Sequence, residues 1–225
     1  MAKGIQLLQK QNADLIVFTG DLVNGDKEEI EPFIELFASL SAPLGKYAIL
    51  GNHDYYGQPR ERELRAAYYE DYFSKFQRMG WDLILNDHRK IEVEGSSIAL
   101  VGVENWGQGR FFPKRGDLKK ALNGVHESDF TILLSHDPTH WDYYVKEDPH
   151  HVHLTLSGHT HAMQFGINTS WFKWSPVSLR YKKWMGLYEE FGKYLYINRG
   201  FGCLGYPGRV GMYPEITVIE LKKKR

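Results

Sequence analysis

Short apolar runs alternate with longer amphipathic segments along the chain, which is the pattern of an α/β protein. Apolar runs bounded by glycine or polar residues predict strands at 15–18, 47–50, 91–93, 98–103, 131–134, 152–156, 194–197 and 216–221. Apolar side chains three and four residues apart predict helices over 4–10, 27–40 and 60–79. The pattern contains no linker, so we predict a single α/β domain over residues 1–225 with mixed sheets.

Polar clusters follow four of these predicted strands. They are Gly20-Asp21, Gly51-Asn52-His53-Asp54, Ser135-His136-Asp137 and Gly158-His159-Thr160-His161. Ligands of α/β proteins bind at the carboxyl ends of strands, and glycine lets the backbone turn tightly there. Residues i and i+2 of an extended chain face the same side, so His159 and His161 would look into one space. Together the clusters indicate a metal-binding site.

Each cluster also has a simpler structural interpretation. Asp21 and Asn24 are suited to capping the helix that begins near residue 27. The Asn52-His53-Asp54 stretch is compatible with a tight turn, because Asn and Asp tolerate left-handed backbone. His136 is compatible with a hydrogen-bonded core histidine. The repetition of metal-capable side chains after four strands favours the metal site.

Composition narrows the function classes. The 28 basic and 28 acidic residues cancel, which argues against nucleic acid as a partner. The single Cys203 excludes an internal disulfide framework. Hydrophobic residues make up 42% of the chain, as in a globular protein, and the sequence contains no apolar run of transmembrane length.

The order of the four clusters resembles that of the calcineurin-like metallophosphoesterases. Their motifs run D-x-H, G-D-x-x-[DN], G-N-H-[DE], a single His, and G-H-x-H. Residues 20–24, 51–54, 136 and 158–161 match the last four in order. The resemblance covers nearly the whole chain and implies a four-layer αββα sandwich with mixed sheets. It also implies a metal-dependent phosphoesterase in which metal-bound hydroxide attacks a phosphodiester or pyrophosphate.

The resemblance assigns roles to individual residues. Asp21 would bridge two metals, with Asn52, His136 and His159 completing one site. His161 would bind the second metal. His53 would be the catalytic imidazole, and Asn24 would accept a hydrogen bond from it where many relatives carry Asp. A mixed set of imidazole, amide and carboxylate ligands favours Mn, Fe or Zn.

The family's first motif is the one without a match. The only D-x-H is Asp148-Pro149-His150, which lies between His136 and the G-H-x-H motif and does not replace it. We therefore expect an N-terminally truncated chain whose first strand is missing. It would hold one metal ion, against two in the full-length protein. A missing strand would leave residues 15–18 at an open edge, which favours a strand-mediated dimer.

Substrate and location are less sharply defined. Residues 98–107, 134–138 and 198–200 resemble a branch whose members are often membrane-attached, some of them acting on lipid-linked phosphate esters or pyrophosphates. Residues 171–188 mix aromatic and basic side chains, which suits either a membrane interface or packing on the sheet. Membrane-associated and cytoplasmic locations both stay open. Arg110 and Arg199 are candidates for binding the substrate.

The alternative function is an inactive scaffold of the same fold that binds a protein partner. Retention of His53 and of four ligands for one metal argues against it, because a scaffold has no need of them.

Overall fold

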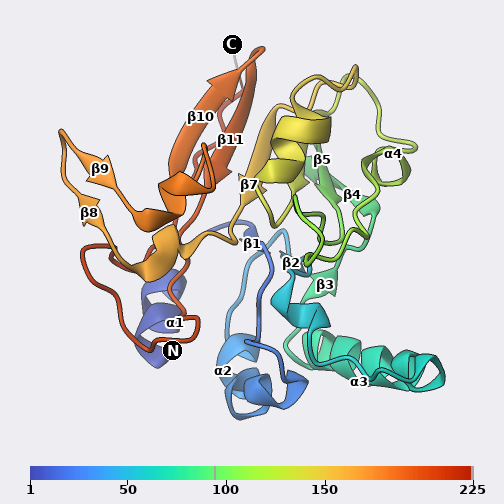
Figure 1. The fold of residues 1–225 in the computed structure, drawn as a ribbon. Coiled ribbons are helices and arrows are strands. Elements are labelled where there is room, and N and C mark those ends of the chain that lie inside the picture. The colour runs from blue at the N-terminus through green and yellow to red at the C-terminus, as the bar shows by residue number, and fades with distance from the viewer. Residues whose placement is uncertain (94, 224–225) are drawn as a thin grey trace.

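The computed structural model describes residues 1–93 and 95–223, which form two main sheets (Figure 1). The smaller sheet is parallel and has the order β1 (Ile16–Phe18), β2 (Lys46–Ala48), β3 (Asp82–Leu83). The larger sheet is mixed. Its order is β10 (Gly186–Glu190), β11 (Lys193–Ile197), β7 (Leu154–Ser157), β6 (Phe130–Leu134), β5 (Ser96–Gly102), β4 (Asp87–Val93).

Helices cover the outer faces of both sheets. The α-helices are α1 (Ala2–Gln9), α2 (Ile34–Ala38), α3 (Arg65–Arg78) and α4 (Leu118–Ala121). Segments of 3-10 helix are η1 (Lys27–Phe33), η2 (His53–Tyr55), η3 (Arg62–Leu64), η5 (His161–Gln164) and η6 (Pro176–Leu179), and η4 (Trp141–Val145) is a π-helical turn. A separate hairpin joins β8 (Ile167–Asn168) to β9 (Lys173–Trp174).

Three apolar clusters fill the spaces between these layers. One lies between the sheets and contains Ile49 with Leu100 and Ile132. A second packs α1, α2 and α3 against the small sheet, and a third packs α4 and η4 against the large sheet. Alternate residues of a strand face opposite sides, which is why neighbours in β5 and β6 contribute to different clusters. The four-layer αββα arrangement expected from the family resemblance is present.

Most predicted elements are found, with shifted ends. The segment predicted as one helix over 27–40 divides after Phe33 into η1 and α2, because the nearby Pro32 has no N–H for a continuous helical ladder. A capping box between Asp26 and Glu29 fixes the start of η1. The two-residue strands β3, β8 and β9 carry too little periodicity to be predicted, and β10 was not predicted either.

The prediction of a strand at 216–221 is wrong. These residues are described but form no strand, and Val218 and Leu221 are exposed. The segment is held to the large sheet by side chains instead, with Asn198 Nδ2 donating to Thr217 Oγ1 at 2.6 Å. Alternating apolar residues need a neighbouring strand to form a ladder, and β11 already pairs with β10 and β7.

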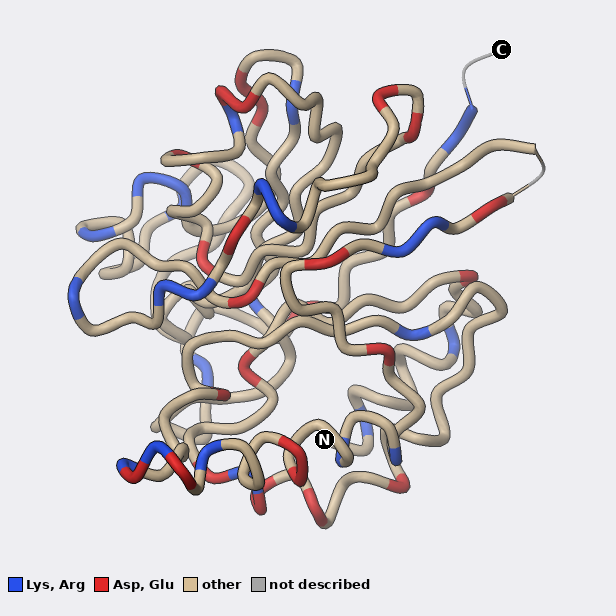
Figure 2. The backbone as a smooth tube through the Cα atoms, turned by 90° about the vertical axis from the view of Figure 1, so that its right-hand side faces the viewer, with Lys and Arg blue, Asp and Glu red and all other residues tan. Residues whose placement is uncertain are grey.

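Charge and hydropathy follow the sequence expectations. Figure 2 shows Lys and Arg interspersed with Asp and Glu along the chain on the side in view. Within residues 1–93 and 95–223, no helix is long and apolar enough to cross a membrane.

Candidate metal centre

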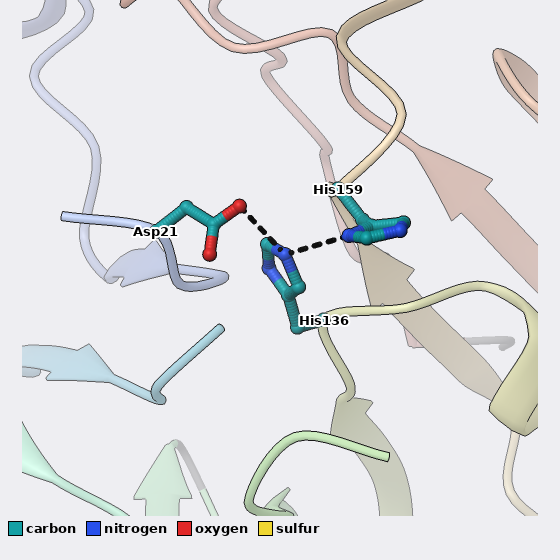
Figure 3. Close-up of side chains that lie close together, drawn as sticks. All are labelled: Asp21, His136 and His159. Atoms are coloured by element: carbon teal, nitrogen blue, oxygen red, sulfur yellow. Dashed lines mark hydrogen bonds and ion pairs between the residues drawn. The ribbon is translucent and has the colours of Figure 1, made fainter. Parts of the chain in front are cut away.

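The loops that follow β1, β2, β6 and β7 meet at one end of the sandwich. Because β1 and β2 belong to the small sheet and β6 and β7 to the large one, both sheets supply side chains to this space. Ligand atoms of Asp21, His136 and His159 all lie within 4.8 Å of one another (Figure 3). Segments more than one hundred residues apart in the chain are thereby brought together.

The remaining predicted ligands lie beside this trio. Asp21 Oδ2 is 3.0 Å from His136 Nε2, which is 3.2 Å from His159 Nδ1. Asn52 Oδ1 is 2.7 Å from the same His159 nitrogen. His161 Nε2 is 4.0 Å from Asp21 Oδ2. Asn52 and His136 are almost completely buried, so few waters can reach the cluster from their side.

The hydrogen bonds around the cluster leave acceptor atoms facing one another. His136 Nδ1 lies 2.6 Å from the carbonyl oxygen of Thr19, so Nδ1–H donates there and Nε2 is the ring nitrogen that faces Asp21. His161 Nδ1 is buried and has no hydrogen-bond partner among the described residues, and the buried Asp21 Oδ2 has only the His136 ring beside it, at 3.0 Å. Buried acceptors that converge need a cation between them. This donor set therefore fits a divalent transition metal.

Electrostatics within the cluster also favour a cation. Burial opposes protonation of His136, but the Asp21 charge more than offsets it and raises the pKa of His136 to about 9. Burial would raise the pKa of Asp21, yet the charge of His136 holds it well below its usual range. Burial lowers the pKa of His159 to about 3 and that of His161 to about 4. These two imidazoles are thus neutral at physiological pH and able to act as ligands.

A second set of side chains contacts His159 on the side of the ring that faces away from the cluster. The Tyr181 hydroxyl is 2.7 Å from Nε2, and Asp137 Oδ2 is 3.4 Å from the same atom. Phe112 meets the ring edge-on. Contacts to the outer nitrogen of a histidine ligand fix its tautomer and ring orientation, which leaves Nδ1 directed at the cluster.

Asp54 joins the loops that carry Asp21 and Asn52. Its buried carboxylate accepts hydrogen bonds from the backbone N–H groups of Asp21, Leu22 and Gly51 at 2.7–2.9 Å. The Tyr72 hydroxyl of α3 donates to it at 2.6 Å. Burial and the Asp21 charge raise the pKa of Asp54 to about 6, which still leaves it ionised at neutral pH. The last residue of the Gly-Asn-His-Asp motif is therefore a positioning residue.

Glycine is required where the first two loops touch. A Cβ on Gly51 would lie 2.6 Å from His136 Cε1, and it would also overlap the Asp21 carboxylate. Gly20 has φ +96°, a conformation that other residues rarely adopt, and a Cβ there would lie 2.8 Å from His136 Nδ1. These glycines let Asp21 and His136 approach each other.

One predicted contact is wrong. We expected the Asn24 side chain to accept a hydrogen bond from His53, but His53 Nδ1 contacts the backbone carbonyl of Asn24 at 2.7 Å. The Asn24 amide turns away and donates to Glu29 at 3.0 Å. Glu29 also belongs to the capping box of η1, so helix capping determines the orientation of Asn24.

The predicted substrate-binding arginines lie in different surroundings. Arg199 Nε pairs with Glu215 at 2.6 Å, and the exposed Arg110 stacks on Phe111. Two other arginines contact the site more directly. Arg209 donates to the carbonyl oxygen of His161 at 3.4 Å, and Arg180 lies over Phe112 and Tyr181, the two aromatic rings that touch His159. Neither lies in a motif, so sequence reasoning did not assign them to the site.

The family model described as calcineurin-like phosphoesterase matches residues 3–163. The chain therefore belongs to the calcineurin-like phosphoesterase family, whose members are metal-dependent phosphoesterases.

Individual relatives extend the match to nearly the whole chain. It is 32% identical to the metallophosphoesterase YkuE of Bacillus subtilis, over 97% of this chain and 71% of that protein. It is 30% identical to a zebrafish (Danio rerio) transmembrane protein with a metallophosphoesterase domain, over 97% of this chain and 48% of the relative. The UDP-2,3-diacylglucosamine pyrophosphatase LpxG of Chlamydia muridarum is 29% identical, over 84% of this chain and 68% of that protein.

A solved structure shares the fold. The sulfate thiohydrolase SoxB of Thermus thermophilus, in complex with glycerol, superposes with a TM-score of 0.55 at 13% identity. The match covers 87% of this chain but 36% of SoxB. The chain thus spans about a third of that structure and about half of the zebrafish relative.

Proposed function

We propose that this chain hydrolyses a phosphodiester or a pyrophosphate at the metal centre of Figure 3. The observation that supports the proposal best is the convergence of Asp21, Asn52, His136 and His159 from four loops on one buried space. Membership of the phosphoesterase family supplies the reaction class.

Asp21, Asn52, His136 and His159 would hold one divalent ion, and their mixed chemistry favours Mn, Fe or Zn. An ion bound there would supply Lewis acidity toward a phosphoryl oxygen and lower the pKa of a coordinated water. A second ion would have Asp21 and His161 as its ligands, which are too few to hold it tightly, so we propose one firmly held ion per chain. Metal analysis that finds two tightly held ions would contradict this.

His53 would act on the substrate rather than on the ion. It begins η2, and its Nδ1 is engaged by the Asn24 carbonyl. In that tautomer Nδ1–H donates, which leaves Nε2 free for the substrate. As an imidazolium, the ring would stabilise charge on the phosphoryl group and give its Nε2 proton to the departing oxygen as the P–O bond breaks.

The substrate we propose is lipid-linked. The name of LpxG describes a pyrophosphatase for a diacylated sugar nucleotide, and that relative matches 84% of this chain. Arg110 and Arg199 stay candidates for binding the substrate's outer phosphate. Arg180 joins them because it packs on the two aromatic rings around His159.

Two proposals concern assembly and location. Within the described residues β1 pairs with β2 alone, and we propose that its other side pairs with a second chain in a strand-mediated dimer. A monomeric mass in light scattering would argue against that dimer. We also propose association with a membrane.

Hydrolysis of bis(p-nitrophenyl) phosphate with added Mn²⁺ tests the proposed function. We expect activity that falls by about 10²–10⁴-fold in His53→Ala, which is the usual contribution of general acid–base catalysis. Calorimetric Mn²⁺ binding should persist in this variant, because His53 is not a proposed ligand. His151→Ala, at an exposed histidine, is the matched control and should keep full activity. An inactive scaffold predicts no hydrolysis by any of these proteins.

A further inference from the structure

The β8–β9 hairpin projects away from the two sheets (Figure 1). Its turn carries Trp171, which is 86% exposed, next to the exposed Phe172. Ile167 and Trp174, which pair across the hairpin, are also exposed. Large apolar side chains gathered at one exposed tip mark a surface that contacts another phase or molecule.

Packing accounts for only part of this aromatic segment. Tyr181 and Trp184 are buried with Val177 and Met212 in a small cluster beside the site. These two rings pack on residues of η5, η6 and Met212 rather than on the sheet named in the sequence alternative. That alternative does not apply to Trp171 and Phe172 either.

Charge identifies the kind of partner. Residues 162–188 contain four basic residues, Lys173, Arg180, Lys182 and Lys183, and no Asp or Glu. Lys183 is neutralised by Asp142 and Glu190, whereas none of the ion pairs among the described residues includes Lys173 or Lys182. A segment whose charged residues are all basic would repel a second copy of itself. It complements the anionic headgroups and apolar boundary of a lipid bilayer.

The hairpin is attached to the metal centre at both ends. It begins just after η5, the turn that opens with His161, and the chain returns through η6 to Tyr181, which contacts His159. Leu179, which is 85% exposed, extends the apolar surface along this return. A partner that binds the hairpin would therefore lie close to the candidate metal ligands.

We propose that the β8–β9 hairpin docks on an anionic bilayer, with Trp171 and Phe172 at the acyl boundary and Lys173 and Lys182 at the headgroups. Tryptophan favours this boundary because its ring is apolar and its N–H is polar, and lysine extends its charge to the headgroup level. Docking would hold the metal centre next to lipid-linked phosphates. In that respect the inference rests on the proposed function and specifies where its substrate lies.

Flotation of the purified chain with vesicles tests the docking. We expect binding to vesicles of 70% phosphatidylcholine and 30% phosphatidylglycerol, and at least fivefold less binding to pure phosphatidylcholine. Trp171→Ser with Phe172→Ser should reduce binding to the anionic vesicles at least tenfold. Lys173→Glu with Lys182→Glu should abolish the preference for anionic lipid. Leu187→Ser, at an exposed apolar residue of β10, is the matched control and should bind like the parent.

Two results would overturn the proposal. One is a parent chain that binds neither vesicle type, which would leave a protein partner as the occupant of the hairpin. The other is undiminished binding by the Trp171 and Phe172 double variant. Because neither side chain belongs to the metal centre, that variant should hydrolyse soluble bis(p-nitrophenyl) phosphate normally. Failure of docking is thereby distinguished from failure of the proposed activity.

Discussion

Three of the candidate ligands occupy left-handed backbone. Asp21, His159 and His161 have φ of 60°, 65° and 49°. Such conformations cost on the order of 1–3 kcal/mol each for residues with a side chain and persist only where surrounding contacts fix them. Here the fixing contacts are visible, since the Asp54 carboxylate binds the Asp21 N–H and Tyr181 binds the His159 ring. The strain turns ligand side chains inward at the ends of strands.

Sequence reasoning identified the residues that stand in motifs. Asp21, Asn52, His136, His159 and His161 were predicted to meet, and the structure brings them together. The supporting residues could not be predicted, since Tyr181 touches His159 only because η6 folds back over the site. The hydrogen bond expected between the Asn24 side chain and His53 is absent, because the Asn24 amide binds Glu29 of the η1 capping box instead.

The Gly51→Ala variant tests how tightly the loops must pack. The added methyl would overlap Asp21 and His136, so we expect Mn²⁺ affinity to fall at least tenfold and stability to drop by about 1–3 kcal/mol. Calorimetry and thermal unfolding measure the two effects. Gly202→Ala is the control, because nothing lies within 4 Å of its added methyl. Equal metal affinity in both variants would show that the site adapts to the methyl group.

At the scale of elements, periodicity identified the long helix and the central strands well. It failed at 216–221, where the pattern of a strand is present but its residues stay outside both sheets. Whether an alternating segment becomes a strand depends on a free neighbouring edge, which local sequence does not encode. The short strands β8 and β9 were missed because two residues carry no period.

Asp54 is the residue through which α3 and the two ligand loops support one another. In Asp54→Asn an NH₂ group replaces one of the two carboxylate oxygens that accept backbone N–H groups. Two donors would then face each other, so we expect the free energy of unfolding to fall by about 2–4 kcal/mol. Tyr72→Phe removes one of the four donors and should cost about 1 kcal/mol. Urea unfolding measures both. A smaller loss in Asp54→Asn than in Tyr72→Phe would refute the arrangement.

At the scale of the whole molecule, the site depends on the relative position of two sheets. The apolar cluster between them contains Ile49 and Ile84 from the small-sheet side and Leu100 and Ile132 from the large sheet. The hydrophobic effect brings the sheets together without specifying which side chains meet at the end of the interface. The positions of the ligand side chains are set by Gly20 and Gly51, by Asp54 and by the contacts of His136 and His159. The prediction of one domain over residues 1–225 stays a prediction.

Metal stabilisation of the fold should depend on pH with a definite sign. Without metal, His136 has a pKa of about 9, above its unfolded value of 6.5, so its pairing with Asp21 stabilises the fold fully below pH 6.5. That contribution is lost as the pH rises to 9. An ion must displace the His136 proton, so apparent Mn²⁺ affinity should rise about tenfold per pH unit from 6.5 to 9. We expect the difference in melting temperature between Mn²⁺ and EDTA samples to widen over this range, and a constant difference would contradict the assignment.

The division of the ligand set between the two sheets has a further consequence. Asp21 and Asn52 belong to one half of the sandwich and His136 and His159 to the other, so a cation held by all four would clasp the halves together. A chain whose halves had closed out of alignment could not retain the ion. Metal binding would then select for correct assembly, because only molecules whose two sheets are correctly aligned would hold the ion and hydrolyse the substrate.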